Sequence, residues 1–205
     1  MVQARQFTNK RTAKKIGWIE LITGCMFAGK TEEFIRRLRR HSYAKNNVIA
    51  FKPAIDKRYS EKAVASHNGT TFTCYPVASV QEMQAIFEVE NSKQLIDVVG
   101  IDEVQFLDET VVDFIEELAN QGLIVITTGL DRDFKADPFQ NVDRLLVLAE
   151  YVDKLTAICH QCGNLATRTQ RLVKGKAASK NDPLILVDGS ESYEARCRNC
   201  YQQAK

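Results

Sequence analysis

Eight residues near the N-terminus, Gly24 to Thr31, read GCMFAGKT and have the spacing G-x-x-x-x-G-K-T. In this pattern glycines let backbone N–H groups converge on phosphate oxygens, the lysine adds a positive charge, and the threonine hydroxyl reaches a metal ion. The flanking residues predict a strand over 17–24 and a helix over 31–45, so the helix dipole adds to the anion site. A glycine-rich turn with an incidental lysine is the alternative. We predict that the nucleotide phosphates are bound by Gly24, Cys25, Met26, Phe27, Ala28, Gly29, Lys30 and Thr31.

Two acidic residues, Asp102 and Glu103, stand at the end of a second apolar run, VVGI. The carboxyl ends of parallel strands meet at one edge of a sheet, so both carboxylates should lie where the 24–31 loop opens. Neighbouring residues of an extended strand point to opposite faces and can therefore have different tasks. Asp102, with the Thr31 hydroxyl, is the candidate for binding Mg²⁺ beside phosphates, and Glu103 is then free to accept a proton. The alternative is an acidic pair that caps the next helix.

The task of Glu103 depends on what receives the phosphoryl group. In an ATPase the same carboxylate would orient a water molecule, whereas in a small-molecule kinase it would deprotonate an acceptor hydroxyl. Phe106 and Phe134 follow two predicted strand ends, as expected where a flat base is stacked, but packing in the core explains such residues equally well. The residues alone leave the acceptor open.

Four cysteines near the C-terminus form two C-x-x-C pairs, CHQC at 159–162 and CRNC at 197–200. In a reducing compartment this pattern favours a structural Zn²⁺ site with four thiolate ligands over disulfides or a redox motif. A zinc ion with four sulfur ligands has no open position for catalysis. We therefore predict a small zinc-binding lobe held by Cys159, Cys162, Cys197 and Cys200.

The composition indicates a globular protein without a dominant electrostatic partner. Its 205 residues are 44% hydrophobic and 26% charged, and the formal net charge is +2. A near-neutral charge gives no support to nucleic acid or a membrane as the main partner, and we read the arginines of the 31–45 helix as a solvated face. Segment 1–15 is basic and polar with no apolar stretch behind it, so we expect a flexible N-terminus and a cytoplasmic protein.

Predicted strands and helices alternate between the loop and the cysteines. The pattern gives strands over 48–53, 95–102 and 123–130 and helices over 80–88 and 109–121. Such alternation is typical of βαβ units around a parallel sheet. From about residue 153 the pattern changes to short β-like runs with turn residues. We therefore expect an α/β nucleotide-binding domain over 16–152 and a zinc-binding lobe over 153–205.

Taken together, ITGCMFAGKT, DEVQF, GLDRDF and the paired cysteines closely resemble the type II thymidine kinases, with similarity over 17–201. The resemblance implies a RecA-like α/β domain with a central parallel sheet and a zinc lobe. It implies transfer of the γ-phosphoryl group of ATP, with Mg²⁺, to the 5′-hydroxyl of thymidine. A homotetramer and feedback inhibition by thymidine triphosphate (dTTP) are also implied.

Carried over by position, the resemblance makes Glu103 the catalytic base and the 24–31 loop the phosphate site. It places the thymidine pocket at Met26, Phe106, Leu130, Phe134, Thr169, Val187, Gly189 and Tyr193. The segment 187–189 corresponds to one that closes over the base through main-chain contacts. DKRYS at 56–60 resembles the family's DTRYS, so Arg58 is a candidate for contacting the transferred phosphate, with a solvated loop arginine as the alternative.

Two positions depart from the family's pattern: Cys25 replaces the usual proline, and Leu107 replaces a second phenylalanine. The helix N-terminus and Lys30 could lower the pKa of the Cys25 thiol, but we expect a spacer there. The spacing between the cysteine pairs is also longer, which leaves the match at 187–189 open. We expect loss of zinc to weaken thymidine binding more than ATP binding at the distant loop.

Two other functions fit parts of the pattern. One is a P-loop ATPase that uses its zinc lobe and arginine-rich helix on single-stranded nucleic acid, which would need a basic groove with stacking aromatics. The other is a zinc-stabilised nucleotide-binding module without catalysis, in which Glu103 has no chemical task. We interpret the sequence as a phosphotransferase acting on thymidine, because several motifs stand in the family's order.

Overall fold

The computed structural model describes residues 16–54, 63–65, 71–184 and 191–203. At its centre lies a six-stranded sheet with the strand order β5-β2-β6-β7-β1-β8, in which neighbouring strands run parallel. Its strands are β1 (Trp18–Gly24), β2 (Val48–Pro53), β5 (Tyr75–Val77), β6 (Val98–Ile101), β7 (Ile124–Leu130) and β8 (Tyr151–Leu155). The central parallel sheet predicted for a RecA-like α/β domain is confirmed.

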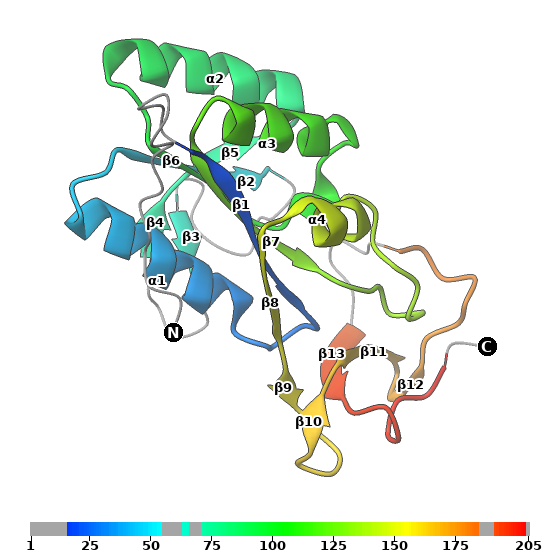
Figure 1. The fold of residues 1–205 in the computed structure, drawn as a ribbon. Coiled ribbons are helices and arrows are strands. Elements are labelled where there is room, and N and C mark those ends of the chain that lie inside the picture. Colours follow the sequence, from blue (N-terminus) through cyan, green and yellow to red (C-terminus); the bar gives the residue numbers. More distant parts are fainter. Residues whose placement is uncertain (1–15, 55–62, 66–70, 185–190, 204–205) are drawn as a thin grey trace.

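Helices cover both faces of this sheet (Figure 1). α1 (Lys30–Tyr43) lies on one face, and α2 (Val80–Lys93), α3 (Thr110–Asn120) and α4 (Val142–Leu148) lie on the other. α1 buries Phe34, Ile35 and Leu38 in a cluster with Ile22 and Ile126 of the sheet. Because side chains alternate along a strand, the remaining apolar residues of the strands form a larger cluster with the other three helices. Both faces of the sheet are therefore buried.

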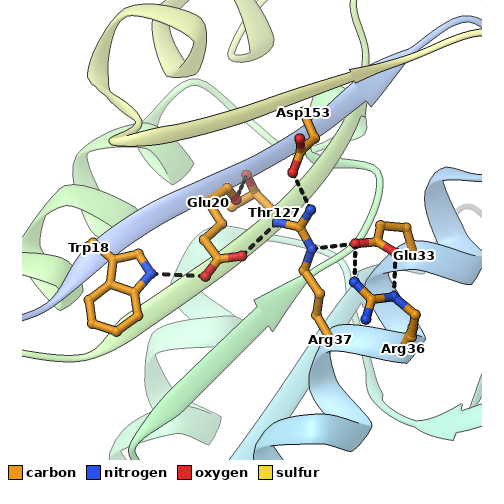
Figure 2. A network of polar contacts seen from close by, with 7 residues as sticks. All are labelled: Trp18, Glu20, Glu33, Arg36, Arg37, Thr127 and Asp153. Atoms are coloured by element: carbon orange, nitrogen blue, oxygen red, sulfur yellow. Dashed lines mark hydrogen bonds and ion pairs between the residues drawn. The ribbon is translucent and has the colours of Figure 1, made fainter. Parts of the chain in front are cut away.

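The arginines of α1 do not all lie on a solvated face, which corrects the expectation from the sequence. Arg37 is buried, whereas the other arginines of this helix are exposed. Its guanidinium donates to Glu20 of β1 at 2.6 Å and to Glu33 at 2.8 Å, and it also bonds Asp153 of β8 (Figure 2). A buried guanidinium needs such partners because water no longer solvates its charge. The network ties the edge strand β8 to β1 and α1.

After β8 the chain forms a small unit of short antiparallel strands, called here the cysteine unit (residues 156–184 and 191–203). Its elements are the paired β9 (Ala157–Ile158) and β10 (Leu165–Ala166), and a sheet of β12 (Lys176–Ala177), β11 (Arg168–Val173) and β13 (Glu191–Arg196). Figure 1 shows this unit beyond the end of β1 at which the chain turns toward α1. Since β8 pairs with β1 as far as Leu155, the parallel sheet extends past the expected domain boundary at residue 152.

Three further short elements belong to the described part of the chain. β3 (Ala63–Ala65) pairs antiparallel with β4 (Thr71–Thr73), and the 3₁₀ helix η1 (Val104–Phe106) follows β6. Among the described residues, none of the helices has the length and apolar character that a membrane span requires. The segment 1–15, expected to be flexible, lies outside the described residues.

Candidate active site

The loop predicted to bind phosphates joins β1 to α1 at the carboxyl edge of the sheet. Gly24 has a φ of +140°, and a Cβ there would lie 2.4 Å from the carbonyl oxygen of Leu155, so this position requires glycine. Gly29 caps α1 with a φ of +81°, and its carbonyl accepts the Glu33 amide. The N-terminus of α1, with the amides of its first turn, therefore opens on the loop, as an anion site requires.

Lys30 brings its positive charge back over the loop. Its side chain is buried, and its Nζ donates to the carbonyl of Cys25 at 3.1 Å. The Cys25 thiol is also buried and donates to the carbonyl of Ala166 in β10 at 3.4 Å. Burial raises the pKa of this thiol, and the charge of Lys30 offsets that effect only in part. Cys25 is thus a protonated, buried thiol that packs in the interior, which supports the predicted role as a spacer without a chemical task.

The loop lies against the cysteine unit, which corrects the expectation that the two are distant. The Met26 amide donates to the Thr169 hydroxyl oxygen in β11 at 3.1 Å. Ala28 packs against the cluster that contains the buried cysteines. Phe27 has 50% of its surface exposed and a φ of +66°, and Thr31 is half-buried in the first turn of α1. One side of the loop is therefore packed, and its tip is accessible.

Asp102 and Glu103 follow β6 at the same edge of the sheet. The hydroxyl of Thr128, at the matching point of β7, donates to Asp102 Oδ1 and accepts the Glu103 amide at 3.0 Å. Glu103 has left-handed backbone angles (φ 51°, ψ 51°), so the chain has left the strand before this residue. The sequence argument placed the two carboxylates on opposite faces of an extended strand. In the structure a turn at Glu103 separates them instead.

The carboxylate of Glu103 is held by Gln105, a buried residue of η1. Gln105 Nε2 donates to Glu103 Oε2, and Gln105 Oε1 accepts the Leu130 amide at 3.2 Å. The opposite orientation of this amide would face an oxygen toward a carboxylate and an N–H group toward another N–H group. A Cβ at Gly129 would lie 3.0 Å from Gln105 Oε1, so the glycine leaves room for this contact. Glu103 is thus anchored to the ends of both β6 and β7.

The residues expected to line the thymidine pocket come from the loop, the sheet edge and the cysteine unit. Thr169 is buried, and the half-buried ones are Met26, Phe106, Leu130 and Tyr193. The ring of Phe134 is 4% exposed, and the Arg171 guanidinium lies 4.8 Å from its centroid. As placed, Phe134 packs as a core residue does, which is the alternative considered from the sequence. The residues that lie outside the described part of the chain are Arg58, Val187 and Gly189.

The four C-terminal cysteines come together from the turn between β9 and β10 and from the residues after β13. Their sulfur atoms all lie within 4.8 Å of one another, and those of Cys162 and Cys197 are 3.6 Å apart. Sulfurs of a tetrahedral zinc–thiolate site stand about 3.8 Å apart, whereas a disulfide bond is about 2.05 Å long. All four are free thiols. The donor set and its geometry fit a tetrahedral metal site and do not fit two disulfides.

The electrostatics of this cluster also favour a cation. Burial opposes ionisation of Cys159, but N–H groups of Cys197, Cys162 and Gln161 outweigh it and lower the pKa to about 6. The sulfurs of Cys162 and Cys197 raise the pKa of Cys200 to about 12. Four thiolates can therefore coexist near neutral pH only if a cation neutralises them.

Thr128 and Gln105 contact the candidate catalytic residues and were not predicted from the sequence. Thr128 belongs to a hydroxyl pair in the otherwise apolar strand IVITTGL, and Gln105 stands two residues after Glu103 in DEVQF. Buried polar side chains usually have partners, so their presence in apolar runs was the available signal. Asp131, directly after β7, is another buried polar residue near this end of the sheet, and its carboxylate forms an ion pair with Lys154 of β8 at 2.7 Å.

Comparisons with known proteins agree with this arrangement. The family model described as thymidine kinase matches residues 17–201. Proteins named thymidine kinase from Mesoplasma florum, Mycoplasma mycoides subsp. mycoides SC and Mycoplasma capricolum subsp. capricolum are 65%, 64% and 61% identical to this chain. The matches cover 94%, 92% and 94% of this chain and 95%, 90% and 92% of those proteins. The resemblance seen in the sequence is confirmed, and the chain belongs to the thymidine kinase family.

Proposed function

We propose that the chain transfers the γ-phosphoryl group of ATP to the 5′-hydroxyl of thymidine and releases thymidine monophosphate and ADP. Membership of the thymidine kinase family supports this activity. The observation that carries the proposal is the anchored carboxylate of Glu103, held by Gln105 at the sheet edge where the 24–31 loop opens. Transfer to an alcohol needs a phosphate site and a proton acceptor side by side.

In this proposal the 24–31 loop holds the triphosphate of ATP. The amides at the start of α1, the helix dipole and Lys30 all favour negative charge there. Thr31 and Asp102 offer a hydroxyl and a carboxylate, the hard oxygen ligands that suit Mg²⁺. When bound, Mg²⁺ neutralises charge on the phosphate oxygens. Arg58 would add a further positive charge to the transferred phosphate.

Glu103 acts on the acceptor. Its carboxylate takes the proton of the thymidine 5′-hydroxyl while the hydroxyl oxygen forms a bond to the γ-phosphorus. The bond from that phosphorus to the bridging oxygen breaks, and its electron pair leaves with ADP. Gln105 holds the carboxylate and Thr128 holds the Glu103 amide, so the base is oriented before the substrates bind. A positioned base of this kind typically contributes about 10²–10⁴-fold in rate.

The cysteine unit completes the nucleoside side of the site. We assign the thymidine contacts to Met26, Phe106, Leu130, Phe134, Thr169 and Tyr193, with 187–189 closing over the base. A structural Zn²⁺ on the four cysteines would hold the strands that carry Thr169 and Tyr193. A homotetramer, feedback inhibition by dTTP and a cytoplasmic location belong to the same proposal.

Incubation with γ-labelled ATP, Mg²⁺ and thymidine tests the activity directly. We expect label on thymidine monophosphate and ADP release that depends on thymidine. The control reaction without nucleoside, with and without a single-stranded oligonucleotide, measures any ATPase activity. Equal ADP release in that control would show an ATPase and contradict the proposal. Binding of ATP without any turnover would indicate a non-catalytic module.

A further inference from the structure

Two hydrogen bonds tie successive residues of the phosphate loop to the cysteine unit. The Cys25 thiol donates to the Ala166 carbonyl, and the Met26 amide donates to the Thr169 hydroxyl oxygen. Each contact joins residues more than 140 positions apart in the chain, at 141 and 143 positions. Cys25 and Thr169 are both nearly fully buried, so water has little access to the thiol and the hydroxyl that make these bonds.

Packing reinforces the two bonds. Cys25 belongs to one buried cluster with two of the metal-site cysteines, Cys159 and Cys197, and Ala28 of the loop packs against the same cluster. These residues are closely packed against one another, so a shift of any one of them would open a void. The loop and the cysteine cluster therefore share one packed interior.

One peptide group of the loop is fixed on both sides. The carbonyl of Cys25 accepts from Lys30 Nζ at 3.1 Å, and the N–H group of the same peptide, at Met26, donates to Thr169 at 3.1 Å. Because a peptide group is planar, the direction of its N–H bond sets the direction of its C=O bond. Thr169 therefore orients the carbonyl that holds the Lys30 ammonium.

We propose that Thr169 is a positioning residue for nucleotide binding, through which the cysteine unit sets the affinity of the phosphate loop for ATP. The inference rests on the proposed role of the 24–31 loop as the phosphate site. It gives Thr169 a task besides its assigned thymidine contact, because the Thr169 hydroxyl acts on Lys30 through the Cys25–Met26 peptide. The structural metal then matters to both substrates.

Thr169→Val tests this role because valine keeps the shape of threonine but accepts no hydrogen bond. The Met26 amide would lose its partner, and the loop would have to order itself when ATP binds, so we expect about tenfold weaker ATP binding. Thr169→Ser keeps the hydroxyl and should restore most of the affinity. Thr167→Val is the matched control, since Thr167 is a neighbouring half-buried threonine whose side chain bonds nothing in the loop.

The decisive measurement is calorimetric binding of ATP with Mg²⁺ in the absence of thymidine, which separates the loop from the nucleoside contact. Hydrogen exchange of the Met26 amide should speed up in Thr169→Val and not in Thr167→Val. Unchanged ATP affinity in folded Thr169→Val, or an equal loss in Thr167→Val, would overturn the inference. If Thr169→Val does not fold, Cys25→Ala replaces it, with a smaller loss of about threefold expected because a thiol is a weak donor. A wild-type chain that binds no ATP would instead refute the phosphate site itself.

Discussion

The parallel sheet and the cysteine unit bury different kinds of side chain. Around the sheet, two clusters of large aliphatic and aromatic residues cover both faces, with Phe34 and Phe51 among the fully buried ones. The buried cluster of the cysteine unit consists of alanines and cysteines, two of which belong to the metal site. Hydrophobic stabilisation grows with the apolar area buried, so the sheet can fold by burial alone and the cysteine unit cannot.

The two regions also contribute different residues to the candidate site. The sheet presents the 24–31 loop, Asp102 and Glu103 at the carboxyl ends of its strands. The cysteine unit, whose buried cluster is made of small residues, presents Thr169 to that same loop. A small unit can do this only if another interaction fixes it, and a tetrahedral metal site provides one.

Loss of the metal should give the largest effect, and it should fall on the cysteine unit and spare the sheet. Structural zinc contributes about 10–16 kcal/mol to the folding of small modules in apparent terms. We expect Cys197→Ala to lower the bound metal and to remove protection from hydrogen exchange throughout the cysteine unit. Amides of β1, β6 and β7 should stay protected, because the sheet keeps its own core.

Cys74→Ala is the matched control for that variant, because Cys74 is a buried cysteine of the sheet clusters. It should keep its metal and the protection of the cysteine unit. If metal-free Cys197→Ala kept a protected cysteine unit, burial alone would stabilise that unit and the contrast would be wrong.

The ion network of α1 should give the next largest effect, on the sheet alone. Arg37→Met leaves Glu20 and Asp153 without their shared cation, so we expect the free energy of unfolding to fall by about 3 kcal/mol in urea titrations. Arg36→Met is the control: the Arg36 side chain is 53% exposed and pairs, among the residues that the structure describes, with Glu33 alone, so its loss should cost less than about 1 kcal/mol. Bound metal should not change in either variant. Equal losses of stability in Arg37→Met and Arg36→Met would mean that burial of Arg37 has no energetic consequence.

The same network gives a pH dependence. Hydrogen bonds from Arg36 and then Arg37 lower the pKa of Glu33 from 4.5 to about 2. This stabilisation is present above pH 4.5 and is lost as the pH falls toward 2.

A change at Gln105 should give the smallest effect, confined to turnover. Gln105→Leu removes the donor that holds the Glu103 carboxylate, and we expect kcat to fall about tenfold with KM for both substrates little changed. Gln121→Leu removes a glutamine–glutamate hydrogen bond on the exposed end of α3 and should leave kcat unchanged. A Gln105→Leu enzyme with normal kcat would show that Glu103 needs no such support.

Patterns of neighbouring residues were enough to predict the sheet and the end of the sheet at which the candidate site lies. Apolar runs indicated β1, β6 and β7, and the glycine spacing marked the loop, because these features are local. The helix predicted over 31–45 is present as Lys30–Tyr43. Helix α4 was not predicted, because its seven residues are too few to show a helical period.

Contacts between distant segments could not be predicted in this way. The burial of Arg37 depends on Glu20 and Asp153, which lie 17 and 116 positions away. The contacts of the 24–31 loop with the cysteine unit join residues 141 and 143 positions apart, and no spacing in the sequence encodes them. The turn at Glu103 depends on Thr128 of another strand.

The catalytic role proposed for Glu103 is tested by the kinetics of Glu103→Gln beside Asp102→Asn over a range of Mg²⁺ concentrations. Glutamine keeps the size of Glu103 but cannot accept the proton, so we expect kcat to fall by about 10²–10⁴-fold while KM for thymidine and ATP changes little. Added Mg²⁺ should partly restore Asp102→Asn and should not restore Glu103→Gln. Near-normal turnover of Glu103→Gln, or its rescue by Mg²⁺, would contradict the assignment of Glu103 as the base.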